Sequence, residues 1–174
     1  MASKFFRNVK TILLFLLIVG GSWAFGRWAI DPETITVNGK TVQVIDGDSF
    51  KDAATEYRIY GIDAPEYRQL CKDTDNRNWP CGKSARTALE KRLSEGQYSC
   101  EVHARDKYGR TIVTCSSGNQ DLGAAMVEQG HAISSDSFDQ VVYGREEASA
   151  EKAKRGIWQG SFETPSSWRA SHPR

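Results

Sequence analysis

Apolar and polar residues alternate in the region that follows residue 33, which is the pattern of half-buried strands. Two such runs, Ile35-Thr36-Val37 and Thr41-Val42-Gln43-Val44-Ile45, flank Asn38-Gly39, a pair typical of a two-residue hairpin turn. A third strand is expected to end at Ile62, because Pro65 lacks the N–H group that a strand ladder needs. The chain up to Ile62 is therefore predicted to be β-structure.

Three later segments have the spacing of amphipathic helices. They run from Lys83 to Glu95, from Asp121 to Gln129, and from about Asp139 to Arg155. The first places Ala85, Leu89 and Leu93 on one face. Gly130 and Gly156 are the expected stops of the second and third, since glycine favours the conformation that ends a helix.

The remaining segments complete the predicted architecture. Residues 100–115 are expected to form a hairpin, residues 67–82 a polar loop, and residues 159–174 a C-terminal tail that lies over the surface. Strands come first, helices are interleaved and there is no βαβ repeat, so the chain is predicted to be α+β, a small Greek-key barrel with helices.

The first thirty residues differ from the rest of the chain. An uncharged run over residues 11–25 follows three basic residues, and Ser22-Trp23-Ala24 satisfies the small-residue rule for signal cleavage. Residues 1–30 are predicted to be either a cleaved signal peptide or an uncleaved N-terminal membrane anchor. A buried helix is the alternative, although the run is apolar on every face. Both export interpretations place the domain outside the cytoplasm, in a periplasmic or extracellular location.

Charge limits the kind of nucleic-acid contact that is possible. The 174 residues include 23 Lys and Arg against 22 Asp and Glu, so the chain is nearly neutral. Such a chain lacks the broad basic surface that holds duplex DNA nonspecifically. Any binding of nucleic acid must therefore depend on a local group of charged residues.

Four cysteines on an exported chain predict two disulfides. If residues 106–110 connect two strands, folding the hairpin about its middle sets Cys100 opposite Cys115. Cys71 and Cys81 then close the polar loop. A zinc site is the alternative, but the chain has no Cys-x-x-Cys pair and only three histidines.

Carboxylates gather around two short motifs. Asp48, in Asp46-Gly47-Asp48, and Asp63 offer oxygen ligands for a hard cation such as Ca2+, and Ala64 adds a main-chain carbonyl. Glu66, just after Pro65, is the candidate to align and activate a water molecule. Hydrolysis of a phosphodiester needs a metal and a base of this kind.

Two arginines are candidates for fixed positive charge. By alternation Arg58 shares a strand face with Tyr60 and Ile62, and on the interior side of a barrel it must meet an anion or an acid. Arg110 follows Tyr108-Gly109. Guanidiniums that converge on one phosphate clamp two oxygens and stabilise the charge of the transition state. With the carboxylates, they predict a metal-dependent phosphodiesterase.

Each of these residues also has an ordinary structural explanation. Asp46-Gly47 is common turn chemistry, Asp63 can simply begin a loop, and Glu66 fits a surface carboxylate. Arg58 fits a structural salt bridge and Arg110 an edge-strand charge. The functional interpretation gains its weight from the motifs taken together.

In their order and spacing, the motifs resemble the staphylococcal nuclease (thermonuclease) family. They are Val44-Ile45-Asp46-Gly47-Asp48-Ser49-Phe50, Tyr57-Arg58 with Gly61-Ile62-Asp63-Ala64-Pro65-Glu66, Asp106-Lys107-Tyr108-Gly109-Arg110, and Gly156-Ile157-Trp158. The resemblance covers roughly residues 36 to 158. It implies an OB-fold, a five-stranded Greek-key barrel with three α-helices, within a domain spanning residues 34–158.

The resemblance also implies Ca2+-dependent cleavage of DNA and RNA at the 5′ side of the phosphorus, which leaves 3′-phosphate products. It would assign Ca2+ binding to Asp48, Asp63 and the Ala64 carbonyl, phosphate binding and transition-state charge to Arg58 and Arg110, water activation to Glu66, and contacts with the terminal phosphate to Lys107 and Tyr108.

Three positions depart from the family pattern. Ala64 stands where the best-known members have threonine, but the ligand there is the main chain. Asp136 and Phe138 stand where the family's nuclease has tyrosines that stack on and flank the nucleotide. Loss of one aromatic platform weakens base stacking, an effect of roughly 1–3 kcal/mol per base.

We therefore expect an exported or membrane-anchored nuclease, acting as a monomer on single-stranded or frayed DNA or RNA. The alternative is a catalytically weak OB-fold module that binds nucleic acid or a partner protein in the cell envelope. A disulfide-stapled scaffold of the envelope is a third interpretation, but convergent charges cost stability when unpaired and a scaffold does not need them.

Overall fold

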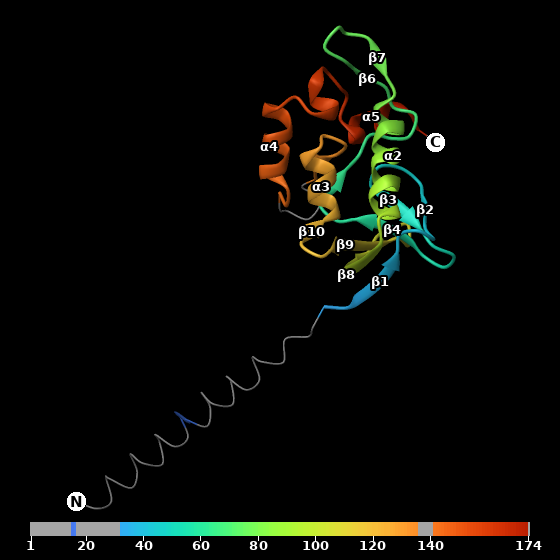
Figure 1. Cartoon of the computed structure of the whole chain (residues 1–174), viewed down its shortest axis with the longest axis vertical. Helices are drawn as coiled ribbons and strands as arrows, with labels where there is room; N and C mark the ends of the chain where they lie inside the picture. The colour runs from blue at the N-terminus through green and yellow to red at the C-terminus, as the bar shows by residue number, and fades with distance from the viewer. Residues whose placement is uncertain (1–14, 17–31, 136–140, 174) are drawn as a thin grey trace, which may run out of the picture. The chain divides into compact units, whose positions relative to one another are not determined.

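The computed structural model describes residues 15–16, 32–135 and 141–173. The chain divides into two units, Met1–Pro32 and Glu33–Arg174. In the first unit Phe15 and Leu16 are helical, and the rest of the predicted signal peptide or anchor lies outside the described residues. Within the described ranges, no helix is both long and apolar enough to cross a membrane. The second unit contains the sheet, the helices and the candidate site (Figure 1).

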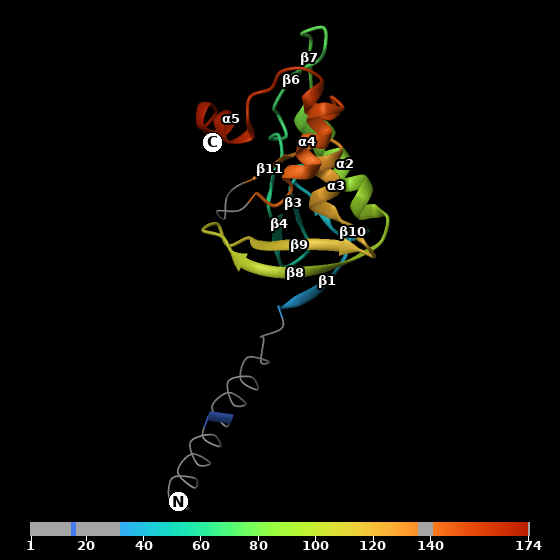
Figure 2. The ribbon, with the colours of Figure 1, turned by 90° about the vertical axis from the view of Figure 1, so that its left-hand side faces the viewer.

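One curled sheet forms the framework of the second unit (Figure 2). Its strands are hydrogen-bonded in the order β1-β8-β9-β4-β3-β2, and β10 pairs with β9. The pairing is antiparallel except between β4 and β9, which are parallel. The strands are β1 (Thr34–Asn38), β2 (Gln43–Val44), β3 (Ser49–Lys51), β4 (Glu56–Ile59), β8 (Gln97–Arg105), β9 (Thr111–Ser117) and β10 (Gln120–Asp121).

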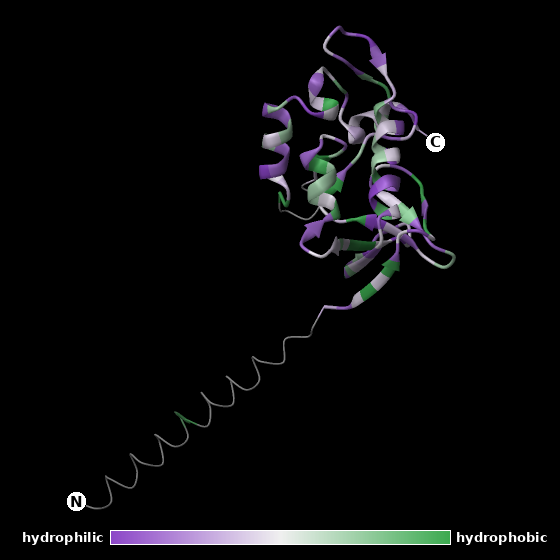
Figure 3. Ribbon diagram, viewed as in Figure 1, coloured by the Kyte–Doolittle hydropathy of each residue, from purple (hydrophilic) through white to green (hydrophobic). Residues whose placement is uncertain are grey.

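Three helices lie on one side of this sheet (Figures 1 and 2). They are α2 (Cys81–Ser94), α3 (Leu122–Glu128) and α4 (Gly144–Lys152). The predicted apolar face of the first helix is confirmed, because Ala85, Leu89 and Leu93 are all buried. They belong to one core with Phe50, which stacks on Tyr57 with ring centroids 5.2 Å apart. Figure 3 shows hydrophobic residues in α3 and β1 and mainly hydrophilic residues in α4. The predicted α+β class is confirmed.

Several shorter elements lie outside the main sheet and the three helices. Two short antiparallel pairs join β5 to β11 and β6 to β7. These elements are β5 (Ile62–Asp63), β6 (Cys71–Lys72), β7 (Asn78–Trp79), β11 (Ile133–Ser134), the 3-10 helix η1 (Gly156–Gln159) and α5 (Pro165–Ser171). The predicted polar loop at residues 67–82 therefore contains a short hairpin.

The predicted hairpin around Asn38-Gly39 does not form. Thr41 donates its N–H to the Asn38 carbonyl at 3.0 Å, so the chain does turn, but β1 pairs with β8 instead of β2. Gly39 does not have the positive φ that the tightest hairpin turns require. A Cβ at Gly39 would lie 2.0 Å from the Leu93 carbonyl oxygen. The glycine is required here for its close approach to the end of α2.

The two predicted disulfides are present. Cys100 and Cys115 are directly opposite each other in the β8–β9 pairing and are bonded. Cys71 and Cys81 form the second bond, which ties β6 to the start of α2. All four cysteines are buried, and none of them is free. The zinc interpretation of the cysteines is thereby excluded.

The C-terminal part differs most from the sequence-based prediction. The expected helix from Asp139 to Arg155 is observed as α4, which begins at Gly144, while residues 139 and 140 lie outside the described ranges. The residues expected to form a surface tail contain α5. Thr164 caps this helix by accepting a hydrogen bond from the Ser167 N–H, and Pro165 occupies its first turn.

Candidate active site

Asp48 is fixed by the tight turn that leads into β3. The Asp46 side chain accepts hydrogen bonds from the Asp48 N–H at 3.3 Å and from the Ser49 hydroxyl. Gly47 is buried, and a Cβ there would lie 2.6 Å from the Ala85 Cβ and 2.7 Å from the Ala64 Cβ. The motif is thus a turn, as its composition suggests, but one pressed against α2 so that Asp48 faces the rest of the site.

Arg58 joins the two candidate metal-binding carboxylates. Tyr57 and Ile59 turn into the core, so alternation places Arg58 on the other face of β4, where its side chain is 20% exposed. Its Nη1 donates to Asp48 Oδ1 at 2.8 Å, and its Nη2 donates to Asp63 Oδ1 at 2.9 Å. The expectation that this arginine meets an acid is therefore confirmed, with two acids instead of one.

Burial and charge act against each other within this cluster. Burial raises the pKa of Asp48 well above its usual value, although the adjacent Arg58 guanidinium opposes the rise. Burial alone would lower the pKa of Arg58, but the Asp48 and Asp63 carboxylates outweigh it and raise that pKa. Arg58 is consequently a permanent cation. The Ala64 N–H adds a hydrogen bond to Asp48 Oδ2 at 2.9 Å.

Glu66 projects from a rigid loop that follows β5. Pro65 is fully buried, and the Glu66 N–H donates to the Gln69 side chain at 3.1 Å. Gln69 is itself buried and donates through Nε2 to the Glu163 carbonyl at 2.6 Å. These contacts hold the backbone of Glu66, while its side chain remains 16% exposed and can reach a bound molecule.

The third motif forms the turn between β8 and β9. Asp106 Oδ2 accepts a hydrogen bond from Arg110 Nε at 2.8 Å, and Asp106 Oδ1 accepts one from the Arg110 N–H at 2.9 Å. Among the described residues, nothing accepts from Nη1 or Nη2 of Arg110, so these donors are available. Tyr108 is 73% exposed, with the Lys107 Nζ 5.1 Å from its ring centroid.

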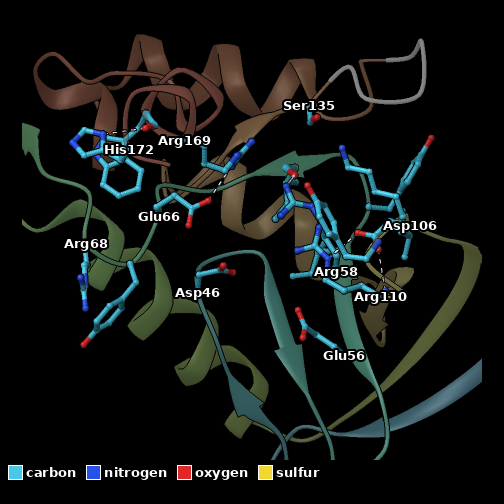
Figure 4. Close-up of a pocket in the computed structure, with 18 of the residues that line it drawn as sticks. Asp46, Glu56, Arg58, Glu66, Arg68, Asp106, Arg110, Ser135, Arg169 and His172 are labelled. Atoms are coloured by element: carbon cyan, nitrogen blue, oxygen red, sulfur yellow. Dashed lines mark hydrogen bonds and ion pairs between the residues drawn. The ribbon is translucent and has the colours of Figure 1, made fainter. Parts of the chain in front are cut away.

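All of these segments border one groove of about 1800 Å3. Figure 4 shows Arg58, Asp106 and Arg110 toward the β8–β9 turn, with Glu66 toward α5. The sequence-predicted residues that line the groove are Arg58, Glu66, Lys107, Tyr108 and Arg110. Asp48 and Asp63 reach it through Arg58. The structure therefore brings the candidate residues together, except that Asp136 and Phe138 lie outside the described residues.

One residue of the groove was missed by the sequence reasoning. Arg169 on α5 donates through Nη1 to Asp63 Oδ1 at 2.9 Å and to Glu66 Oε1 at 3.2 Å, and through Nη2 to Asp63 Oδ2 at 3.0 Å. The hydrogen bonds with Asp63 are the main reason that the pKa of Arg169 is raised. The Thr164-Pro165 pair is a helix-start signal, but nothing local indicates where the helix docks.

The oxygen atoms around Arg58 have the chemistry of a hard-cation site. Asp48 and Asp63 each present an oxygen to the same guanidinium, so the two carboxylates lie close together. Within the described part of the chain, no three His, Cys, Asp or Glu side chains form a ready-made metal cluster. Two carboxylates and a main-chain carbonyl nevertheless fit Ca2+, which accepts mixed oxygen ligands and water.

The chain is similar to proteins of one family. Residues 56–160 match the family described as staphylococcal nuclease homologue. Over 122 residues the chain is 33% identical to the succinoglycan biosynthesis protein ExoI of Rhizobium meliloti, an alignment that covers 69% of this chain and 64% of that protein.

Two eukaryotic proteins are also similar. A probable staphylococcal-like nuclease of Oryza sativa subsp. japonica is 33% identical over 67% of this chain and 30% of its own length. A probable endonuclease of Verticillium alfalfae is 28% identical over 67% of this chain and 44% of its own length. The chain thus spans less than two thirds of each of these three relatives. The family match covers more than half of the chain, and the chain therefore belongs to the family of staphylococcal nuclease homologues.

Proposed function

We propose that the chain is a hydrolytic nuclease that acts on DNA or RNA. The observation that carries this proposal is the convergence of Arg58, Glu66 and Arg110 on one groove, next to two carboxylates that share the Arg58 guanidinium. Family membership supports the same reaction class. Two of the similar proteins are named as a nuclease and an endonuclease.

The proposed reaction is attack of water on a phosphodiester. Glu66 accepts a proton from the water, whose oxygen forms a new bond to phosphorus. The bond from phosphorus to the 5′ oxygen breaks, and that oxygen leaves as a 5′-hydroxyl after taking up a proton, so the other product carries a 3′-phosphate. Arg58 and the free Nη donors of Arg110 stabilise the negative charge that gathers on the phosphoryl oxygens.

Ca2+ is the proposed cofactor. Asp48, Asp63 and the Ala64 carbonyl would hold it, and bound Ca2+ supplies positive charge beside the phosphate and favours deprotonation of the attacking water. Asp48 is oriented for this role by the Ala64 N–H, which occupies its other oxygen.

Single-stranded or frayed nucleic acid is the proposed substrate. The exposed Tyr108 ring offers a stacking surface, and Lys107 and Arg110 lie 5.1 and 5.5 Å from its centroid. Aromatic rings with flanking cations suit unpaired bases and their phosphates. The near-zero net charge of the chain does not favour a broad basic surface of the kind that holds duplex DNA.

We place the protein outside the cytoplasm, in a periplasmic or extracellular compartment. Two buried disulfides are consistent with an oxidising compartment. The basic and apolar N-terminal sequence agrees with export, as either a signal peptide or an anchor.

Digestion of labelled single-stranded and double-stranded DNA by the purified full chain tests the proposal. We expect cleavage with Ca2+, none with a chelator, and faster loss of the single strand. Glu66→Gln retains the shape of the side chain but removes the base, so it should bind the substrate and cleave it poorly. No cleavage by folded wild-type protein that still binds single strands would favour the alternative binding module.

A further inference from the structure

The carboxylates of the proposed metal site are already engaged by Arg169. Three hydrogen bonds of 2.9–3.2 Å join its guanidinium to both oxygens of Asp63 and to Glu66. Asp63 is nearly buried, with 9% of its side chain exposed. The Arg169 side chain is 40% exposed, so the contact is a forked, charge-assisted pairing between a partly exposed guanidinium and an almost buried carboxylate.

The lone pairs of Asp63 are almost fully used. Each carboxylate oxygen can accept about two hydrogen bonds. Asp63 Oδ1 accepts from both Arg58 and Arg169, and Asp63 Oδ2 accepts from Arg169. One acceptor position remains on Asp63. A Ca2+ ion needs direct oxygen contacts at about 2.3–2.6 Å and is repelled by guanidinium charge. Arg169 and a cation therefore compete for the oxygens of Asp63.

The charge count of the cluster also favours exchange of Arg169 for a divalent cation. Counted as formal charges, Asp48, Asp63 and Glu66 contribute three negative charges against the two positive charges of Arg58 and Arg169. When Arg169 leaves, two negative charges are uncompensated, which equals the charge of one Ca2+ ion. Exchange of the guanidinium for the metal therefore keeps the cluster close to neutral, as a partly buried group of charges requires.

Helix α5, which carries Arg169, is attached to the domain loosely enough to move away from Asp63 and Glu66. Of the residues of α5, Pro165 is the buried one. The segment before it is anchored, because the Lys72 N–H donates to the Ser161 carbonyl at 2.8 Å and Gln69 binds the Glu163 carbonyl. An element with little buried apolar area opens at low cost. α5 can thus swing about a fixed base without unfolding the domain.

We infer that Arg169 is a built-in counter-ion that occupies Asp63 and Glu66 before metal binds, so that α5 sets the affinity of the site for Ca2+. The inference rests on the proposed function, because it takes Asp63 to be a metal ligand. Metal binding displaces Arg169 from Asp63 and Glu66 and opens the groove beside Trp168. The chain is then least active when Ca2+ is scarce.

Calorimetric titration of the full chain with CaCl2 tests this inference without any cleavage assay. Arg169→Gln should lower the Kd roughly tenfold, the factor expected if the guanidinium covers the carboxylates in about nine molecules of ten. Arg68→Gln is the matched control, since Arg68 lines the same groove and pairs with no described carboxylate; its Kd should stay near the wild-type value. Arg169→Lys keeps the charge but not the fork, and should fall between these values.

Hydrogen exchange supplies a second readout. Ca2+ should speed amide exchange in the peptide covering residues 161–173 of the wild type, whereas Arg169→Gln should exchange fast with or without Ca2+. An unchanged or weaker Kd in Arg169→Gln, or equal gains in Arg169→Gln and Arg68→Gln, would overturn the inference while leaving the nuclease proposal standing. If neither the wild type nor Arg169→Gln binds Ca2+, the metal site itself fails, and the inference with it.

Discussion

Replacement of Gly47 by alanine tests whether the active-site turn is positioned by close packing. The added Cβ would lie 2.6 Å from the Ala85 Cβ and 2.7 Å from the Ala64 Cβ, and ordinary contact begins at 3.4 Å. To restore ordinary contact, the turn, α2 or the Ala64 loop must therefore move by up to about 1 Å. Overpacking of this kind costs about 1–3 kcal/mol, which lowers the Tm by roughly 3–10 °C for a domain of this size.

The same shift should impair the site. Asp48 follows Gly47 directly and accepts a 2.9 Å hydrogen bond from the N–H of Ala64, which the new methyl group would crowd, so the shift should disturb the position of Asp48. A displacement approaching 1 Å lowers turnover by about 100-fold in well-ordered sites. Thermal melting of Gly47→Ala, together with Ca2+-dependent cleavage of single-stranded DNA, measures both effects.

Two further variants make the test specific. Gly96→Ala adds the same methyl group where nothing lies within 4 Å, so it should leave the Tm and the turnover nearly unchanged. Ala85→Gly removes one of the two obstructing atoms and should reduce the cost of Gly47→Ala when the two are combined, despite the roughly 1 kcal/mol that a helical glycine costs. Equal Tm and turnover for Gly47→Ala and Gly96→Ala would refute the packing argument.

The remaining predictions concern charge, the disulfides and pH. Arg58→Lys and Arg110→Lys should each lower turnover by orders of magnitude, because lysine cannot clamp two oxygens. Arg58→Lys should also lower the Tm, since Arg58 donates to two buried carboxylates, whereas Arg110→Lys should change the Tm little. Near-normal turnover in both would remove the clamp from the mechanism. Reduction of the two disulfides should cost roughly 2–4 kcal/mol of unfolding free energy for each bond, measured in urea with and without reductant. Burial lowers the pKa of His131, so stability should fall as the pH drops below about 6.5. His131→Asn should lose less stability over the same range, and identical pH profiles would contradict this.

Local chemistry determines a large part of the domain without reference to any tertiary contact. The four-residue spacing of Ala85, Leu89 and Leu93 predicted α2 and its buried face, because a helix brings such positions onto one side. The symmetry of a hairpin about its turn predicted that Cys100 faces Cys115. In both cases the decisive interaction lies within one element or between two consecutive strands.

The motifs also indicated the chemistry, but not how it is held together. The sequence suggested that Arg58 meets an acid, and only the fold shows that Arg58 donates to both Asp48 and Asp63. Asn38-Gly39 has the composition of a hairpin turn, yet its strand partner is β8, more than fifty residues away. The pairing of β1 depends on which strand edge the curled sheet leaves open, and that information is not local.

The position of α5 is the clearest case of a property that tertiary structure alone decided. The sequence itself contains the start signal of this helix in Thr164-Pro165, because capping depends on neighbouring residues. It does not contain the pairing of Arg169 with Asp63, which joins residues separated by 106 positions. Ion pairs of this kind leave no periodic pattern, since they depend on where two distant backbones end in space. The sequence by itself determined the elements and the chemistry of the groove, whereas the tertiary structure decided which charges meet in it.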